Sequence, residues 1–297
     1  MIGFGANPPR STDPRLLSVA LEPLHRAPLE VWRVQGDVVH GRLGDLAFAH
    51  DDALLFAAME VAEEARDIRG AADEAYSALR RRTTDLGFPH LLRVWNYLDD
   101  ITIGEDDEER YRHFCVGRAT GLGNDFSTAT LPAATAIGRV HPVGRLQVYW
   151  LAARTPGLPL ENPRQVSAYH YPRQYGPQPP SFARAMLPPG GMPLLISGTA
   201  AIRGHASLHA DCVDAQLDET LANIEALAGV ARVRGSRFPV SLGPGTTLKA
   251  YVRDEAELAR VDAALAARLP DVPRIVLHAR ICRRELRLEI DGVHGVA

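Results

Sequence analysis

The sequence predicts an α+β fold made of two copies of one structural unit. The chain has 297 residues, which is enough for two domains of ordinary size. Residues 155–163 include three prolines, and proline interrupts regular structure, so we expect a boundary near residue 157. The same order of helix, strand, helix, strand and strand is expected on each side, within domains 1–157 and 158–297.

The first half opens with a long segment of helix-forming residues. Apolar residues recur at helical spacing over residues 54–87, which predicts one helix there. Acidic residues begin the segment 106–123, where the helix dipole favours them, and this predicts a second helix. Strands are expected at 91–98, 130–140 and 145–154, the last two as a closing pair.

The second half shows a similar order of elements. Gly229 follows a helical pattern and stands where a C-cap is expected. Asp254 precedes another such pattern and is expected to begin that helix. The expected elements are helices 209–229 and 254–269 and strands 246–254, 273–281 and 285–293.

Charge and composition exclude several classes of protein. The net charge is −3, from 33 basic and 36 acidic residues, so neither nucleic acid nor an acidic membrane is expected as a partner. No run approaches the roughly 18 apolar residues of a spanning helix, and the first residues lack the pattern of a signal peptide. The three cysteines form no Cys-x-x-Cys pair, so we expect no disulfide framework and a cytoplasmic protein.

Four segments of the second half carry a resemblance to a known family. They are LISGTAAIRGH, DAQLDETLANIEALAG, LKAYVRDEAEL and PRIVLHARICRRELRLEIDGV. They resemble the reactive-intermediate deaminases (RidA/YjgF), whose active cleft lies between subunits. The resemblance implies that a late Arg and a Glu line this cleft, here Arg274 and Glu289.

A second resemblance covers residues 95–292 and is more specific. The segments RVWNYLDDI, EERYRHFCVGRATGL, YHYPRQYGPQPPSFARA and ICRRELRLEIDG resemble the chorismatases, whose single chain holds RidA-like domains. The resemblance implies two such domains in a pseudo-trimeric arrangement, with central sheets and outer helices. It also implies that chorismate is cleaved to pyruvate and a ring acid without metal or organic cofactor. Whether the chain is a monomer or a small homo-oligomer stays open.

Glu289 is the candidate catalytic acid. Cleavage begins with protonation of the enolpyruvyl methylene carbon, and carbon is a poor base, so the acid must lie close to it. Burial raises the pKa of a glutamic acid and keeps it protonated near neutral pH. Leu286 and Leu288 alternate with Arg287 and Glu289, which places Glu289 on the face opposite the leucines. The pattern alone is more typical of a solvated carboxylate, but both resemblances put their acidic residue here.

Arginines are expected to bind the two carboxylates of chorismate, because the guanidinium group binds a carboxylate through two hydrogen bonds. Arg173 and Arg184 lie in the YHYPRQYGPQPPSFARA segment, whose four prolines predict a stiff, irregular loop. Tyr175 is expected to add a hydroxyl donor. The alternative for both arginines is an ion pair with a surface acid. Arg274 is carried over from the RidA resemblance only.

Small residues are expected to shape the pocket. A buried cysteine is usually an ordinary core residue. The chorismatase resemblance gives Cys282 a second role, because cysteine at this position accompanies formation of a hydroxybenzoate, with the 3-isomer favoured over the 4-isomer. Gly198, in the Ser-Gly pair, is expected at the pocket wall, and Ala200 and Ala201 are where a second small residue would shape the pocket.

Three other functions stay open: a hydrolytic chorismatase that forms a dihydroxycyclohexadiene carboxylate, a RidA-like imine deaminase, and a binding protein for small acids. A metal site at His205, His209 and Cys212 is disfavoured. Their spacing suits a metal only on a helix, and Gly204 and Asp211 indicate that the helix begins later.

Overall fold

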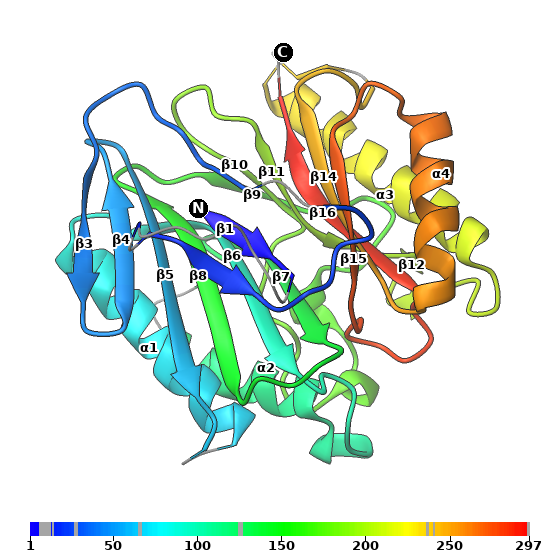
Figure 1. The fold of residues 1–297 in the computed structure, drawn as a ribbon, viewed down its shortest axis with the longest axis horizontal. Coiled ribbons are helices and arrows are strands. Elements are labelled where there is room, and N and C mark those ends of the chain that lie inside the picture. The colour runs from blue at the N-terminus through cyan, green and yellow to red at the C-terminus, as the bar shows by residue number, and fades with distance from the viewer. Residues whose placement is uncertain are drawn as a thin grey trace.

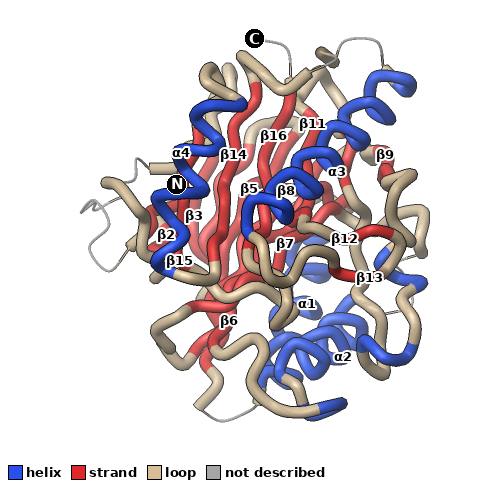
Figure 2. Tube along the Cα trace, turned by 90° about the vertical axis from the view of Figure 1, so that its right-hand side faces the viewer, coloured by secondary structure: helices blue, strands red, loops and turns tan. Residues whose placement is uncertain are grey.

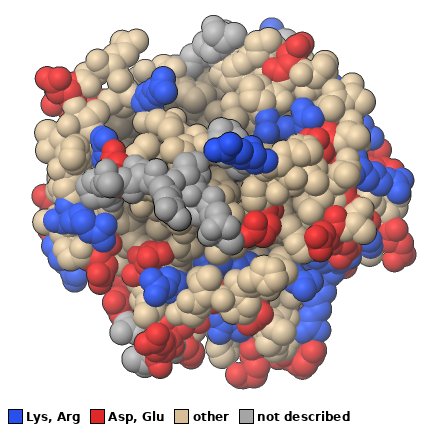
Figure 3. Space-filling view, in the orientation of Figure 1, with Lys and Arg blue, Asp and Glu red and all other residues tan. Residues whose placement is uncertain are grey.

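The structure is a computed structural model that describes residues 1–5, 13, 15–26, 29–64, 67–123, 127–235, 238–239 and 241–295. Two six-stranded sheets form its centre, with helices on their outer sides (Figure 1). Figure 2 shows the same layers after a quarter turn. Basic and acidic side chains are interspersed over the face drawn in Figure 3. Among the residues described, no helix is long and apolar enough to cross a membrane.

The first sheet has the strand order β3-β4-β5-β8-β6-β7. β6 pairs with β7 in parallel and with β8 antiparallel, so the sheet is mixed. Helices α1 and α2 pack against each other on its outer face. The bounds are Val39–Leu43 (β3), Leu46–His50 (β4), Leu54–Ala62 (β5), Ile68–Asp85 (α1), His90–Asp99 (β6), Arg110–Leu122 (α2), Ala133–Arg139 (β7) and Arg145–Ala153 (β8).

The second sheet has the order β9-β10-β11-β16-β14-β15 and carries helices α3 and α4. Two short strand pairs, β1 with β2 and β12 with β13, stand apart from the large sheets. The second-sheet bounds are Leu158–Leu160 (β9), Ala185–Leu187 (β10), Leu194–Thr199 (β11), Val213–Arg234 (α3), Thr246–Val252 (β14), Leu258–Arg268 (α4), Arg274–His278 (β15) and Leu288–His294 (β16). The short pairs are Ile2–Phe4 (β1), Leu17–Val19 (β2), Ile202–Arg203 (β12) and Ala206–Ser207 (β13).

The two sheets repeat one unit. β5, β6, β7 and β8 correspond to β11, β14, β15 and β16, and with this exchange the two strand orders are identical. In each unit a helix follows the first of these strands and another follows the second. The predicted α+β fold with two copies of one unit is therefore confirmed. β8 ends at Ala153 and β9 begins at Leu158. A domain boundary near residue 157 and a pseudo-threefold arrangement stay predictions.

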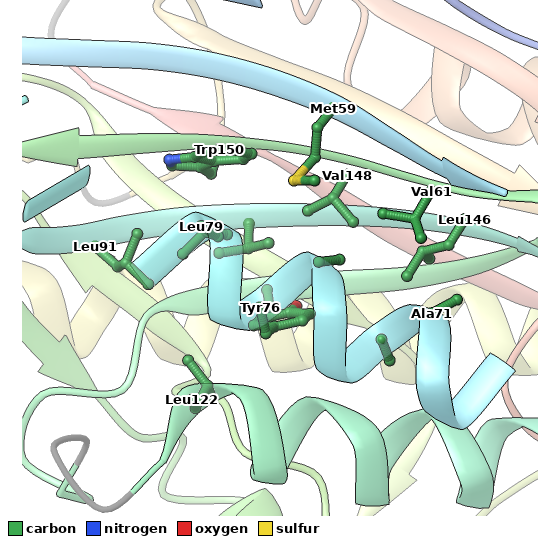
Figure 4. Packing of buried hydrophobic residues seen from close by; sticks show 14 of the residues in the cluster. Met59, Val61, Ala71, Tyr76, Leu79, Leu91, Leu122, Leu146, Val148 and Trp150 are labelled. Atoms are coloured by element: carbon green, nitrogen blue, oxygen red, sulfur yellow. The ribbon is translucent and has the colours of Figure 1, made fainter. Parts of the chain in front are cut away.

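Three apolar layers hold the molecule together. Tyr76 and Trp150 belong to the layer between the first sheet and its helices, drawn in Figure 4. Ile290 belongs to the equivalent layer beneath α3 and α4. Tyr97 and Tyr251 lie in a third layer, between the two sheets. Each fully buried large apolar side chain contributes about 1.5–3 kcal/mol, so the middle layer fixes one unit against the other.

Residues 54–87 form a strand and a helix, so the prediction of one continuous helix was wrong. β5 takes the first part, and α1 begins after Asp67, whose side chain accepts a hydrogen bond of 2.8 Å from the Gly70 backbone nitrogen. Leu55 and Ala57 of β5 face the helices, whereas Phe56 faces the other sheet. Because both faces are apolar, the strand lacks the polar alternation by which a half-buried strand is recognised.

Three smaller predictions were also wrong. α3 continues through Gly229 to Arg234, so Gly229 is not a C-cap; one glycine costs a helix only about 1 kcal/mol. α4 begins at Leu258, after a short 3-10 turn at Glu255–Glu257, so Asp254 is not its N-cap. β7 and β8 do not pair with each other, because β6 lies between them.

Candidate active site

A cavity of about 460 Å³ lies between the two units. The first unit contributes side chains from α2 and β7, and the second contributes β11, β16 and the loop before β16. The proline-rich segment lines it as well, through Tyr171, Gln174, Tyr175, Pro180, Phe182 and Arg184. A concave site of this size, with walls from several elements, suits a small-molecule ligand.

Glu289 lies on β16 and is only 5% exposed. Its neighbours Leu288 and Ile290 point into the core beneath α3 and α4, so strand alternation turns Glu289 to the other face, where it lines the cavity. The predicted alternation was wrong for Leu286, which precedes β16 and lines the same cavity as Glu289. Burial, together with the charge of Asp291, raises the pKa of Glu289 to about 8 against the lowering effect of nearby arginines. The carboxyl group is therefore protonated at neutral pH and can act as a proton donor.

Gly198 and Cys282 enclose the Glu289 carboxyl group. A Cβ atom on Gly198 would lie 1.9 Å from Oε1 of Glu289, so only glycine leaves room for it. The Cys282 Sγ atom lies 4.0 Å from Oε2. Burial raises the pKa of Cys282 well above its usual value, so the thiol stays neutral and can donate to the carboxyl oxygen. Cys282 lies in the loop before β16.

Arg118 and Arg184 approach the ring of Phe182, with their guanidinium carbons 6.0 and 5.2 Å from its centroid. Arg184 donates to the Val166 carbonyl oxygen at 2.9 Å and to the Tyr171 hydroxyl at 2.6 Å. The Nε atoms of both arginines are buried and have no hydrogen-bond partner among the described residues. Both arginines line the cavity, and a guanidinium group beside a cavity is suited to a carboxylate ligand.

Arg283 organises the rim of the cavity. Its guanidinium carbon lies 4.0 Å from the Tyr175 ring centroid and 5.0 Å from that of Tyr171. The same guanidinium donates to the His205 carbonyl oxygen at 2.9 Å, and the Tyr175 hydroxyl lies 3.2 Å from Nδ1 of His205. These contacts hold the loop of Tyr171 and Tyr175 against the segments that contain His205 and Arg283, and Arg283 is a third cation that lines the cavity.

Comparison with known proteins identifies the family. The family profile described as "Chorismatase FkbO/Hyg5-like, N-terminal" matches residues 30–152. A chorismatase of Streptomyces hygroscopicus is 39% identical over 271 residues, which are 89% of this chain and 78% of that protein. The chain belongs to the chorismatase family.

Other comparisons extend over most of this chorismatase-family chain. A 3-hydroxybenzoate synthase of Streptomyces hygroscopicus is 34% identical over 278 residues, 89% of this chain and 80% of that protein. A chorismatase crystal structure is 33% identical, has a TM-score of 0.82, and is matched over 99% of this chain and 92% of that chain. The YjgF protein of E. coli matches 46% of this chain and 98% of its own, at 16% identity and a TM-score of 0.34.

The structure brings most of the predicted site residues of this family member to one cavity. Those that line it are Glu289, Cys282, Gly198, Tyr175 and Arg184. Ala201 is fully buried and stands behind the wall, which its neighbours Ala200 and Ile202 form.

Two predicted arginines lie elsewhere. Arg173 is 65% exposed and forms an ion pair with Asp107, which is the alternative that the sequence left open for it. Arg274 donates to Asp262 at 2.7 Å and lines a separate cavity of about 350 Å³. Neither belongs to the cavity that contains Glu289.

Several residues of the cavity were not predicted. Arg118 lies in a segment that carried the chorismatase resemblance, but on a helix without any local motif. Tyr171 and Phe182 belong to the proline-rich segment, where the presence of several aromatic residues was the available signal. Thr135 comes from the first unit and is brought to the site only by the packing of β7 beside β11.

Proposed function

We propose that the chain cleaves chorismate to pyruvate and a hydroxybenzoate, with Glu289 protonating the methylene carbon of the enolpyruvyl group. The observation that carries this proposal is a buried carboxyl group of raised pKa that shares one cavity with Arg118 and Arg184. The relatives named chorismatase support chorismate as the substrate.

Arginines from both units line the cavity, together with the acidic residues Glu105, Asp106, Glu109 and Glu285. Chorismate has one carboxylate on its ring and another on its enolpyruvyl group. We assign one of them to Arg118 and Arg184 and the other to Arg283, because all three arginines line the cavity. Binding at both ends orients the methylene carbon toward Glu289 and replaces the water around the substrate with fixed donors.

The chemistry closes without any other reagent. A proton from Glu289 turns the enol ether into a group that leaves the ring as pyruvate when the ring carbon–oxygen bond breaks. Loss of a proton from the hydroxyl-bearing ring carbon then gives the 4-isomer directly. The 3-isomer forms when the hydroxyl oxygen bonds to the neighbouring cationic carbon, its bond to the original ring carbon breaks, and the carbon that now carries oxygen loses its hydrogen as a proton. Either route returns one proton for the proton spent, so Glu289 is restored.

For the ring product, we favour 3-hydroxybenzoate. The relative named 3-hydroxybenzoate synthase supports it. The Cys282 side chain beside Glu289 also supports it, because it fills space in which a water molecule would otherwise attack the ring. The alternative is hydrolysis to the dihydroxycyclohexadiene carboxylate, which consumes one water.

The deciding experiment incubates the purified chain with chorismate, with and without EDTA, and follows pyruvate and the ring product. Pyruvate with 3-hydroxybenzoate in equal amounts, unaffected by EDTA, is expected. A diol would retain chorismate cleavage and contradict the product assignment. Activity on 2-imino acids without pyruvate from chorismate would contradict the proposal as a whole.

Arg184→Met is expected to raise KM for chorismate about 10- to 100-fold, because a hydrogen-bonded charge contributes about 1.5–3 kcal/mol. The matched control is Arg173→Met, which removes an arginine of the same loop that is paired with exposed Asp107. Steady-state kinetics should leave the control within about twofold of the wild type, since exposed ion pairs contribute little. Equal effects in both variants would contradict the assignment.

Cys282→Ala is expected to shift the ring product toward the diol. Removal of Sγ opens space next to Oε2 of Glu289 that a water can occupy. Chromatography of the products checks this, with Cys115→Ala as the control, because Cys115 is a buried thiol in the core beneath the first sheet. An unchanged product ratio in Cys282→Ala would remove Cys282 from the product assignment.

A further inference from the structure

A second buried carboxylate lies on the strand that carries Glu289. Asp291 is two residues further along β16, on the same face, and is 1% exposed. Its Oδ2 atom lies 3.2 Å from Nη2 of Arg93 and accepts hydrogen bonds from the hydroxyls of Thr135 at 2.9 Å and Tyr251 at 3.0 Å. These three contacts fix the orientation of the Asp291 carboxyl group.

The contacts of Asp291 reach the cavity wall through one residue. Thr135 lines the cavity, donates to Asp291 and accepts a hydrogen bond from Arg93. The Thr135 methyl group lies 3.3 Å from the point where a Gly198 Cβ would stand, and that point is 1.9 Å from Glu289. Thr135 therefore packs on Gly198, which encloses the Glu289 carboxyl group. The hydroxyl of Thr135 is held by its hydrogen bond to Asp291.

On the side away from the cavity, Lys249 is next to Asp291. Its Nζ atom lies 3.7 Å from Oδ1 of Asp291 and donates to Glu30 at 2.9 Å and to the Tyr149 hydroxyl at 2.9 Å. Lys249 does not line the cavity of Glu289. Lys249 therefore compensates part of the charge of Asp291 without contacting a ligand in the cavity of Glu289.

We propose that Asp291 is a positioning residue of the reaction: its fixed negative charge keeps the proton on Glu289, and its bond to Thr135 fixes the wall beside that carboxyl group. The inference rests on the proposed function and adds a residue to it. Two carboxyl groups on one strand face are about 7 Å apart. A second negative charge at such a site is unfavourable, so the proton remains on Glu289 until the substrate takes it.

The other groups around Glu289 act in both directions. Arg93, Arg184 and Arg283 lower its pKa, whereas burial and Asp291 raise it. The thiol of Cys282 and the hydroxyl of Tyr111 are neutral, because burial raises the pKa of each well above its usual value. Among the largest charge effects on the pKa of Glu289, that of Asp291 opposes those of the arginines.

The test is the pH dependence of kcat/KM for pyruvate release from chorismate. In Asp291→Asn, the alkaline limb should move to lower pH by about one unit or more, because a buried negative charge is lost while Arg93 stays. Lys249→Met should move the limb in the opposite direction, because Asp291 then loses part of its compensation. The second variant keeps the inference testable if Asp291→Asn does not fold.

The matched control is Asp99→Asn. Asp99 is also a buried carboxylate paired with an arginine, Arg139, at 2.6 Å, but it does not line the cavity. Its variant should lower Tm and leave the limb in place. Two results would overturn the inference, provided that the wild type releases pyruvate. In one, the alkaline limb of the pH profile of Asp291→Asn lies at the same pH as that of the wild type. In the other, the limb of Asp99→Asn moves as far as that of Asp291→Asn. Absence of pyruvate from the wild type would instead overturn the proposed function.

Discussion

Glu289→Gln is expected to lower kcat for pyruvate release by about 10²- to 10⁴-fold, the range that a general acid contributes. Glutamine keeps the shape of the side chain but cannot deliver a proton to carbon. KM should change little, because the arginines that would hold the substrate carboxylates stay in place. Stopped and continuous pyruvate assays on the purified variant measure both constants.

The same variant should be more stable than the wild type above neutral pH. Glu289 has its pKa raised from an ordinary 4.5 to about 8. Because the pKa is higher in the folded state, Glu289 contributes its full share to the free energy of unfolding below about pH 4.5. That contribution is lost as the pH rises to about 8. Glutamine cannot ionise, so the difference in Tm between variant and wild type should grow across this interval.

Glu219→Gln is the control for both measurements. The Glu219 carboxylate pairs with Arg164 at 2.6 Å and does not line the cavity. Its variant should keep the wild-type kcat and show no gain in Tm between pH 5 and 8. If Glu289→Gln retains activity, another group delivers the proton, and the assignment of Glu289 fails.

Strand alternation could predict the face on which Glu289 lies, whereas its role as the acid came from the two family resemblances. Leu288 and Ile290 mark one face of β16 as core, so the carboxyl group between them must lie on the other. The repeat could be predicted for a similar reason, since the order of elements is local information. The strand β5 could not, because both of its faces are buried and its residues also favour helices.

Local sequence patterns could not predict which residues of the first unit contribute to the site. Thr135 and Asp291 are 156 residues apart in sequence and 2.9 Å apart in space. Arg118 stands on α2 with no neighbour in sequence that indicates a binding role. One signal was available for Arg93, a charged residue within the apolar segment LLRVWNYL, because a buried charge must have a partner. Its partner could be found only from the packing of the two sheets.

Gly198→Ala is expected to lower kcat by about 10²-fold, the cost of misplacing a reacting group by about 1 Å. The new methyl group would lie 1.9 Å from Oε1 of Glu289 and 2.8 Å from its Cδ. Either the carboxyl group turns away from its position or β11 moves back, and overpacking of this kind costs about 1–3 kcal/mol. Kinetics and thermal unfolding measure the two effects separately.

Gly229→Ala is the matched control for this substitution. No atom lies within 4 Å of a Cβ on Gly229, which is inside α3. Alanine there should raise stability by up to about 1 kcal/mol and leave kcat unchanged. Since the φ angle of Gly198 is not positive, its backbone can accept alanine, and only the space beside Glu289 opposes it. A fully active Gly198→Ala variant would therefore mean that Glu289 still works when its carboxyl group is displaced. Close packing around that carboxyl group would then not be required for proton transfer to the substrate.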